Sequence, residues 1–235
     1  IIAMGLPAAL AFSQLTKTIP IVISNIDADP VKEGLITSLA RPGGNITGMM
    51  GIQWELAEKR LQILKEVAPR AQRIAVLFDP RTNAGHAHVE GTQSGALKLG
   101  IQLQLLEAPD PEAIDRSFKA ARQAGADAMS VIHVGQMQTQ RSRIVNLAAA
   151  ARLPAIYSSI PFADDGGLMA YASDPVAQYR RVAAIVERVL KGAKPADLPM
   201  ERPTKFELVV NLKTAKALAI TIPAPVLARA DRIIE

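Results

Sequence analysis

The sequence predicts an α/β protein built from parallel sheets, and three observations lead to this fold class. Short apolar runs rich in Ile, Val and Leu, such as residues 19–24 and 73–79, recur along the 235 residues with helical segments between them. The runs are continuous instead of alternating, which is typical of strands buried on both faces. Apolar residues make up 49% of the chain and aromatic residues 4%, which suits such strands under Ala-rich helices. Because parallel strands need crossover helices, we expect two doubly wound parallel-sheet lobes.

The first lobe begins with three predicted strands and two predicted helices. Pro7 lies in the first turn of its helix, where the missing N–H of proline does no harm. Asp29 is the N-cap of the second helix and Pro30 its first residue, and the run Pro42-Gly43-Gly44 ends it. In chain order the predicted elements are a strand at 1–4, a helix at 7–16, a strand at 19–24, a helix at 30–40 and a strand at 46–51.

An amphipathic helix at 55–68 leads into the second lobe, with Leu61 and Leu64 on its apolar face. Asp110 and Asp174 each precede a proline and are the predicted N-caps of the helices that follow. The remaining predicted strands lie at 73–79, 101–107, 127–133, 154–157, 168–172 and 206–211. The remaining predicted helices lie at 84–99, 111–124, 137–151, 175–190, 212–218 and 223–234.

The composition excludes several classes of function. The chain has no cysteine, which rules out disulfides, thiolate metal sites and a cysteine nucleophile. The net charge of +5 is scattered instead of gathered in one basic stripe, so we do not expect a nucleic-acid partner. His86 and His88 are two positions apart on a predicted helix and face different ways, so they make a poor metal pair. We therefore expect neither a metal nor a cofactor.

Catalytic signatures are missing from the sequence. It contains no GxGxxG after a strand, no GxxxxGK[ST], no GxSxG and no HExxH, so we expect no catalytic residues and no enzyme. An enzyme on a two-lobed α/β scaffold, such as a racemase or a hydrolase, is the alternative, and Asp29 with His133 is the pair it would use. The effector domain of a transcription regulator is a third interpretation, which requires a DNA-binding headpiece.

Ligands of open parallel sheets bind beyond the carboxyl ends of the strands, so the residues after each strand form the candidate site. Ala8 and its neighbours begin a helix whose free N–H groups attract an anion. Asp27 and Asp29 offer negative charge to an amine. The ligand-binding candidates are Leu6, Ala8, Asp27, Asp29, Thr47, Gly48, Asp79, Asn83, His133, Gly135, Tyr157 and Ser158.

Several of these candidates also have a purely structural interpretation. Asp29 is an N-cap whatever else it does, and Asp79 before a proline fits a turn at a strand end. His133 could hydrogen-bond a loop, and Tyr157 could belong to the core with its hydroxyl near water. The residues alone leave these alternatives open.

The chain resembles the ABC transporter substrate-binding family that includes the tryptophan-binding, TrpX-like proteins. The most specific segments are ARPGGNITG at 40–48 and PTKFELVVNLKTAKAL at 203–218. Weaker matches occur at 17–22, 29–31, 64–69, 166–171 and 190–199. The resemblance covers essentially the whole chain.

This resemblance implies a type I periplasmic-binding fold with a ligand in the cleft between two lobes. It places residues 1–53 and 174–195 in the N-terminal lobe and residues 54–173 and 196–235 in the C-terminal lobe. It also implies that the first βα units of the N-terminal lobe, together with an export signal, are missing from this chain. A lobe without its first strands has an open sheet edge, which a partner chain could cover in a dimer or a swapped assembly.

The resemblance further implies a solute-binding component of an ABC importer, in the periplasm or otherwise exported. Its partners would be a small polar solute and a membrane permease. An amino acid, with aromatic ones as one option, or a small organic acid would be the solute. Binding would act by hinge closure, because only the closed form makes contacts from both lobes.

Overall fold

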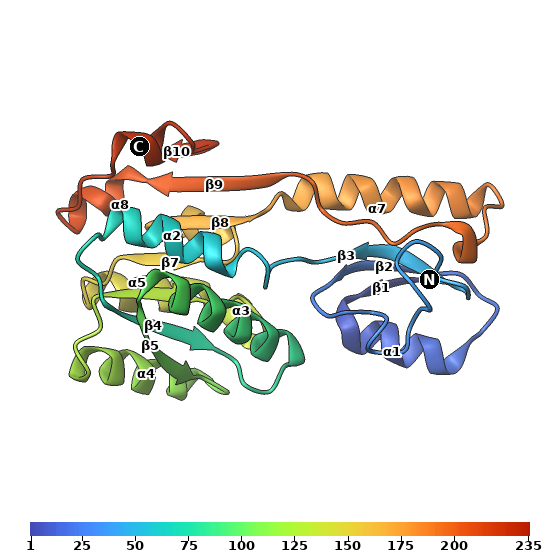
Figure 1. Ribbon diagram of the computed structural model, residues 1–235, viewed down its shortest axis with the longest axis horizontal. Coiled ribbons are helices and arrows are strands. Elements are labelled where there is room, and N and C mark those ends of the chain that lie inside the picture. The colour runs from blue at the N-terminus through green and yellow to red at the C-terminus, as the bar shows by residue number, and fades with distance from the viewer. The chain divides into compact units, whose positions relative to one another are not determined.

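The computed structural model describes residues 1–134 and 137–235, and the chain folds into two compact units (Figure 1). Unit 1 contains Ile1–Ile52 and Ser173–Lys205, and unit 2 contains Gln53–Ala172 and Phe206–Glu235. Residues 196–205 belong to unit 1 and not to the C-terminal lobe that the resemblance implies. The reason is that Glu201 forms a parallel bridge with Met49, so this segment extends the sheet of unit 1.

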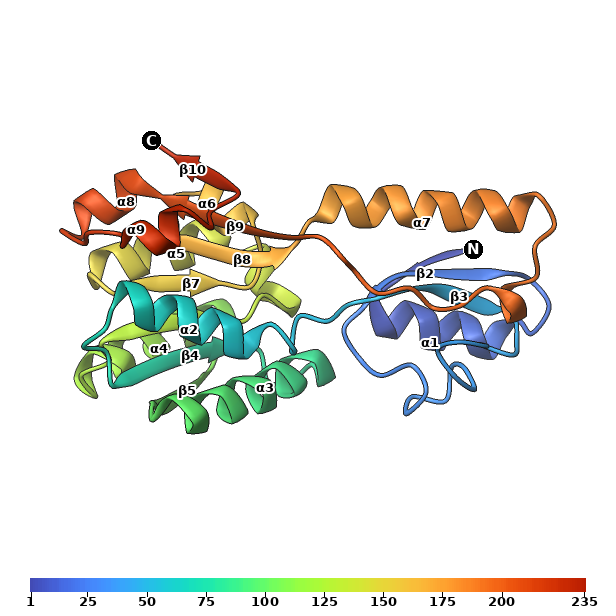
Figure 2. The same ribbon diagram turned by 45° about the horizontal axis from the view of Figure 1, so that its top comes forward.

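Unit 1 is a three-stranded parallel sheet between two long helices. Its strands lie in the order β1-β2-β3, and α1 and α7 cover opposite faces of the sheet (Figures 1 and 2). On one face, Val22 and Met49 pack with Val182 and Ile185 of α7. The elements are β1 (Ile2–Met4), α1 (Gly5–Leu15), β2 (Ile21–Ile26), β3 (Ile46–Met50), α7 (Pro175–Leu190) and a short 3₁₀ helix (Pro195–Asp197).

Unit 2 is built on a seven-stranded sheet in the order β10-β9-β8-β7-β6-β4-β5. The pairs β10–β9, β8–β7, β7–β6, β6–β4 and β4–β5 are parallel. The strands are β4 (Arg73–Phe78), β5 (Gln102–Glu107), β6 (Ala128–Val131), β7 (Ala155–Tyr157), β8 (Met169–Ser173), β9 (Phe206–Asn211) and β10 (Arg232–Ile234). The helices are α2 (Ala57–Val67), α3 (Asn83–Leu99), α4 (Pro111–Gln123), α5 (Arg141–Ala150), α6 (Pro161–Asp164), α8 (Leu212–Ala217) and α9 (Ala224–Leu227).

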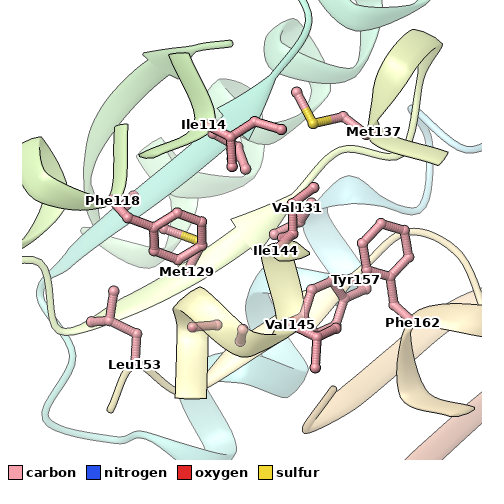
Figure 3. Close-up of a cluster of buried hydrophobic side chains, with 14 of the residues drawn as sticks. Ile114, Phe118, Met129, Val131, Met137, Ile144, Val145, Leu153, Tyr157 and Phe162 are labelled. Carbon is pink, nitrogen blue, oxygen red and sulfur yellow. The ribbon is translucent and has the colours of Figure 1, made fainter. Parts of the chain in front are cut away.

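The core of unit 2 has two halves because successive residues of a strand point to opposite faces. Met129 and Val131 of β6 pack toward α4, α5 and α6, in the cluster that Figure 3 shows. Ala128 of the same strand packs on the other side, with side chains of α2, α3, α8 and α9. A sheet buried on both faces explains why the strands are continuous apolar runs.

Helix starts follow the predicted capping chemistry. The side chain of Asp110 accepts a hydrogen bond from the Ala113 N–H at 2.6 Å, and α4 begins at the next proline. The side chain of Asp174 accepts from the N–H groups of Val176 and Ala177 at 2.9 and 3.0 Å. Both predicted N-caps are therefore confirmed.

The predicted helix at 30–40 is wrong. Its start forms as expected, since the Asp29 side chain accepts from the Val31 N–H at 2.9 Å. The chain then makes only a turn, because Gly34 adopts a left-handed backbone with φ of 69°. Glycine enters this region without strain, and a helix cannot pass through it.

The predicted helix at 223–234 is also wrong beyond its first turn. Asp231 accepts the Leu208 N–H with its carboxylate at 2.8 Å and donates its own N–H to the Leu208 carbonyl at 2.9 Å. These two bonds direct the chain into β10 beside β9. Pairing with a distant strand overrides the local helical pattern here.

Candidate ligand-binding rims

In unit 1, a helix start and a pair of side-chain oxygens lie at the carboxyl edge of the sheet. The first turn of α1, Gly5–Ala8, follows β1 directly and contains no acidic residue. Met4 precedes it, and its side chain has no oxygen with which to cap the helix. The N–H groups of Gly5 and Leu6 therefore present donors and the positive end of the helix dipole, whereas Pro7 has no N–H and the Ala8 N–H donates to the Met4 carbonyl within the helix.

The side chains of Asn25 and Asp27 meet over Gly51. A methyl group on Gly51 would lie 1.9 Å from Oδ1 of Asp27 and 2.8 Å from Oδ1 of Asn25, so only glycine leaves room for them. Asn25 reaches this position through a left-handed backbone with φ of 58°, at a shift in the β2–β3 register between Ile23 and Ile26. Asparagine tolerates this conformation better than most residues. The result is an electronegative spot at the end of β2.

Three other candidates in unit 1 have clear tasks in the fold. Thr47 is fully buried and its hydroxyl donates to the Leu198 carbonyl at 2.8 Å. Gly48 lets two strands approach, because a methyl group there would lie 2.2 Å from the Ile23 carbonyl oxygen. Asp29 caps the turn that follows it. The fold alone accounts for these three residues, so ligand contacts are not needed to explain them.

In unit 2, Asp79 is buried just after β4 and is paired. The Nε and Nη2 atoms of Arg81 donate to its two oxygens at 2.9 and 2.6 Å, and the Arg81 backbone N–H donates at 3.0 Å. Thr82 then caps α3 by accepting from the Gly85 N–H at 3.0 Å. Asn83, the first residue of α3, is exposed at this helix start.

His133 and Ser158 join the ends of β6 and β7. The backbone N–H of His133 donates to the Ser158 hydroxyl oxygen at 2.7 Å. The imidazole packs edge-on against the ring of Phe162, with centroids 5.7 Å apart. Burial, and then the charge of Arg141, lowers the pKa of His133 to about 4, so the ring is neutral near pH 7. Its Nε2 atom is buried without a hydrogen-bond partner among the described residues.

Tyr157 lies in the core of unit 2 (Figure 3). Its ring stacks on Phe162 with centroids 4.8 Å apart and an angle of 16° between the planes. Burial raises the pKa of its hydroxyl, and the residue is almost completely covered. The structural interpretation of Tyr157 is therefore the one that its position supports. Gly135, also a predicted ligand contact, lies outside the described residues.

Sequence reasoning missed two buried polar residues close to these candidates. Arg60 of α2 is 2% exposed, and His88 of α3 is 1% exposed. Burial lowers the pKa of His88 to about 3, helped by the charge of Arg60 and by His133. A signal for Arg60 existed, because it stands in helical phase with the buried Ala57, Leu64 and Val67.

One groove lies apart from these candidates. A groove of about 330 Å³ in unit 1 is lined partly by Met49, Gln178 and the ion pairs Arg181–Glu201 and Asp174–Lys205, and it contains no predicted ligand contact. Within residues 1–134 and 137–235, no three His, Cys, Asp or Glu side chains gather as a metal site. No helix in these same ranges is long and apolar enough to cross a membrane.

The sequence and the fold can now be compared with those of known proteins. Residues 1–234 match the model of the family described as ABC transporter substrate binding protein. The chain belongs to this family. A tyrosine-binding protein from Clostridioides difficile (strain R20291) is 24% identical over 218 residues, which are 93% of this chain and 62% of that relative. The chain thus spans less than two thirds of the length of this curated relative.

Solved structures agree with the family. A conserved domain protein from Vibrio cholerae has a TM-score of 0.90 and 26% identity, covering 99% of this chain and 77% of that chain. An ABC domain in complex with L-Trp from Streptococcus pneumonia has a TM-score of 0.88 and 27% identity, covering 99% and 80%. The α/β fold class, with its parallel sheets and a type I periplasmic-binding architecture, is confirmed.

Proposed function

We propose that this chain is the solute-binding part of an ABC importer and that its ligand is an amino acid. One observation carries the proposal: a helix start and a carboxylate, which attract opposite charges, lie at the ends of neighbouring strands in unit 1. Strands β1 and β2 pair with Met4 opposite Ser24, so the first turn of α1 and Asp27 share one edge. The relatives described as tyrosine-binding and as bound to L-Trp support the same class of ligand.

The helix start and the carboxylate match the two opposite charges of an amino acid. The backbone N–H groups of Gly5 and Leu6 would hold the carboxylate, as helix starts do for anions. The oxygens of Asp27 and Asn25 over Gly51 would accept from the ammonium group. A small organic acid would bind only to the N–H groups at the start of α1, so it is the second candidate ligand.

Unit 2 would contribute contacts to the rest of the ligand. Near pH 7 the neutral His133 ring, the Ser158 hydroxyl and Asn83 offer hydrogen bonds without a full charge. The charge of Asp79 is already balanced by Arg81. The proposal includes contacts of one ligand with the strand ends of both units. It also includes hinge closure on binding.

The proposal includes the absence of catalysis. An enzyme was expected to use Asp29 with His133, but Asp29 holds a turn and the lowered pKa of His133 makes it a weak base near pH 7. The match to the substrate-binding family favours binding over both the enzyme and the regulator interpretations. We further propose an exported location, a membrane permease as partner, and a dimer or swapped assembly through the open edge of β1.

Calorimetry with matched ligands tests the proposal. L-tyrosine and L-tryptophan should bind, whereas tyramine, which lacks the carboxylate, and 3-(4-hydroxyphenyl)propionate, which lacks the ammonium group, should bind far more weakly. Equal binding of the propionate would favour the organic acid. Scattering with saturating ligand should show compaction, and chromatography with light scattering would report the assembly. Conversion of a bound amino acid into product would contradict the proposal.

A further inference from the structure

The chain passes between its two units three times, at residues 52–53, 172–173 and 205–206. On the unit 2 side, the residues that flank these passages are joined to one another. Gln53 follows the first passage, Tyr171 precedes the second, and Phe206 follows the third. We call these three residues, together with Arg60, the hinge collar.

Arg60 joins the first passage to the second. Its Nη1 atom donates to Oε1 of Gln53 at 3.1 Å and to the backbone carbonyl of Tyr171 at 3.2 Å. Its Nη2 atom donates to the backbone carbonyl of Gln53 at 2.5 Å. A buried guanidinium is costly to desolvate and persists only with well-placed acceptors, so these carbonyl positions are tightly restrained.

Two aromatic rings join the second passage to the third. The rings of Tyr171 and Phe206 lie with centroids 6.4 Å apart, tilted by 40°. The loop after Gln53 is also seated on α3, because a methyl group on Gly91 would lie 2.4 Å from the Trp54 carbonyl oxygen. All three passages are thus anchored to the body of unit 2.

On the unit 1 side, the contact that joins the second passage to the third is weaker. There Lys205 and Asp174 form an ion pair of 2.8 Å, supported by a backbone hydrogen bond of 3.1 Å between the same residues. The Lys205 side chain is 71% exposed, and exposed pairs of this kind contribute about 0–1 kcal/mol. The buried Arg60 bonds are therefore the stronger restraint.

We propose that Arg60 and the Tyr171–Phe206 pair are hinge-positioning residues. They fix the unit 2 ends of all three passages, so that bending is confined to the short links next to them. The inference rests on the proposed function only because hinge bending is the motion that binding would use. None of these residues needs to touch the ligand.

Spin-label distance measurements on ligand-free protein test the proposal. The chain has no cysteine, so Leu15→Cys and Leu97→Cys, at side chains that are 79% and 84% exposed, place one label in each unit. Arg60→Met keeps the length of the side chain but loses its hydrogen bonds, and should broaden the distance distribution. Tyr171→Phe keeps the ring contact and should leave the distribution unchanged. Arg122→Met, at an exposed arginine of α4, is the matched control.

The outcomes separate clearly. A folded Arg60→Met protein with the width of its parent would overturn the proposal, and so would equal broadening in Arg122→Met. Should circular dichroism show that Arg60→Met does not fold, Phe206→Leu is measured instead and interpreted in the same way. Because no ligand is added, failure of L-tyrosine and L-tryptophan to bind would defeat the proposed function and leave this result intact.

Discussion

Gly51 makes room for Asp27: a methyl group on this glycine would lie 1.9 Å from the carboxylate oxygen of Asp27. Gly51→Ala should therefore displace Asp27 and lower the affinity for an amino acid by roughly tenfold or more, the value of a lost charged hydrogen bond. Calorimetry measures the affinity. Gly44→Ala is the control, because nothing lies within 4 Å of its added methyl group. Unchanged affinity in Gly51→Ala would remove Asp27 from the site.

Asp27 and Asp29 can be separated by removing one charge at a time. Asp27→Asn keeps the shape but loses the charge that would hold an ammonium group, so affinity should fall by roughly tenfold or more. Asp29→Asn should leave affinity unchanged, since that side chain caps a turn. Titrations of both variants with L-tyrosine and L-tryptophan decide between them. A loss of affinity in Asp29→Asn but not in Asp27→Asn would show that Asp29 binds the ammonium group.

Stability should fall in mild acid because two buried histidines are neutral in the folded state. The pKa values of His88 and His133 are lowered to about 3 and about 4, whereas an unfolded histidine titrates near 6.5. The unfolded chain binds more protons as the pH falls below 6.5, so unfolding becomes easier. Between pH 7 and pH 5, His88 alone should account for about 2 kcal/mol of the loss.

Urea unfolding at the two pH values measures this effect. His88→Asn should reduce the difference between pH 7 and pH 5, although it lowers stability at pH 7 through lost packing. His86→Asn, at the exposed histidine of the same helix, should keep the full difference. A pH response that is equal in both variants would show that His88 is not the source.

Thr47 should matter for stability and not for binding. Thr47→Val leaves the Leu198 carbonyl without its buried donor, which should cost about 1–3 kcal/mol of unfolding free energy. Thr18→Val, at an exposed threonine, should have little effect. Denaturant unfolding gives both values. If a stable Thr47→Val protein loses ligand affinity, Thr47 contacts the ligand.

Local chemistry was predictable from the sequence, and long-range pairing was not. Asp110 and Asp174 act on N–H groups two or three residues away, so an Asp-Pro pair is sufficient evidence for a cap. The strand at Arg232–Ile234 depends on β9, more than twenty residues earlier, and local helical pattern gave the wrong answer. The helix predicted at 30–40 is absent because Gly34 has a positive φ, and the sequence alone does not determine the φ angle of a glycine.

The candidate site follows the same rule. The carboxyl ends of the strands were predictable, and they direct attention to Leu6, Ala8, Asp27 and His133. The meeting of Asn25, Asp27 and Gly51 depends on a register shift in β2, which no sequence pattern announces. Tyr157 was ambiguous because a tyrosine after a strand suits either a rim or a core, and only its stacking on Phe162 distinguishes them.

The strand order of unit 2 has a consequence for biosynthesis. β9 lies beside β8 in the sheet and β10 beside β9, yet both are translated only after the whole of α7. On the ribosome, the edge of β8 therefore stays unpaired until β9 has been synthesised. Late completion of this sheet would keep the nascent chain unfolded for longer, which the exported location that we propose would require.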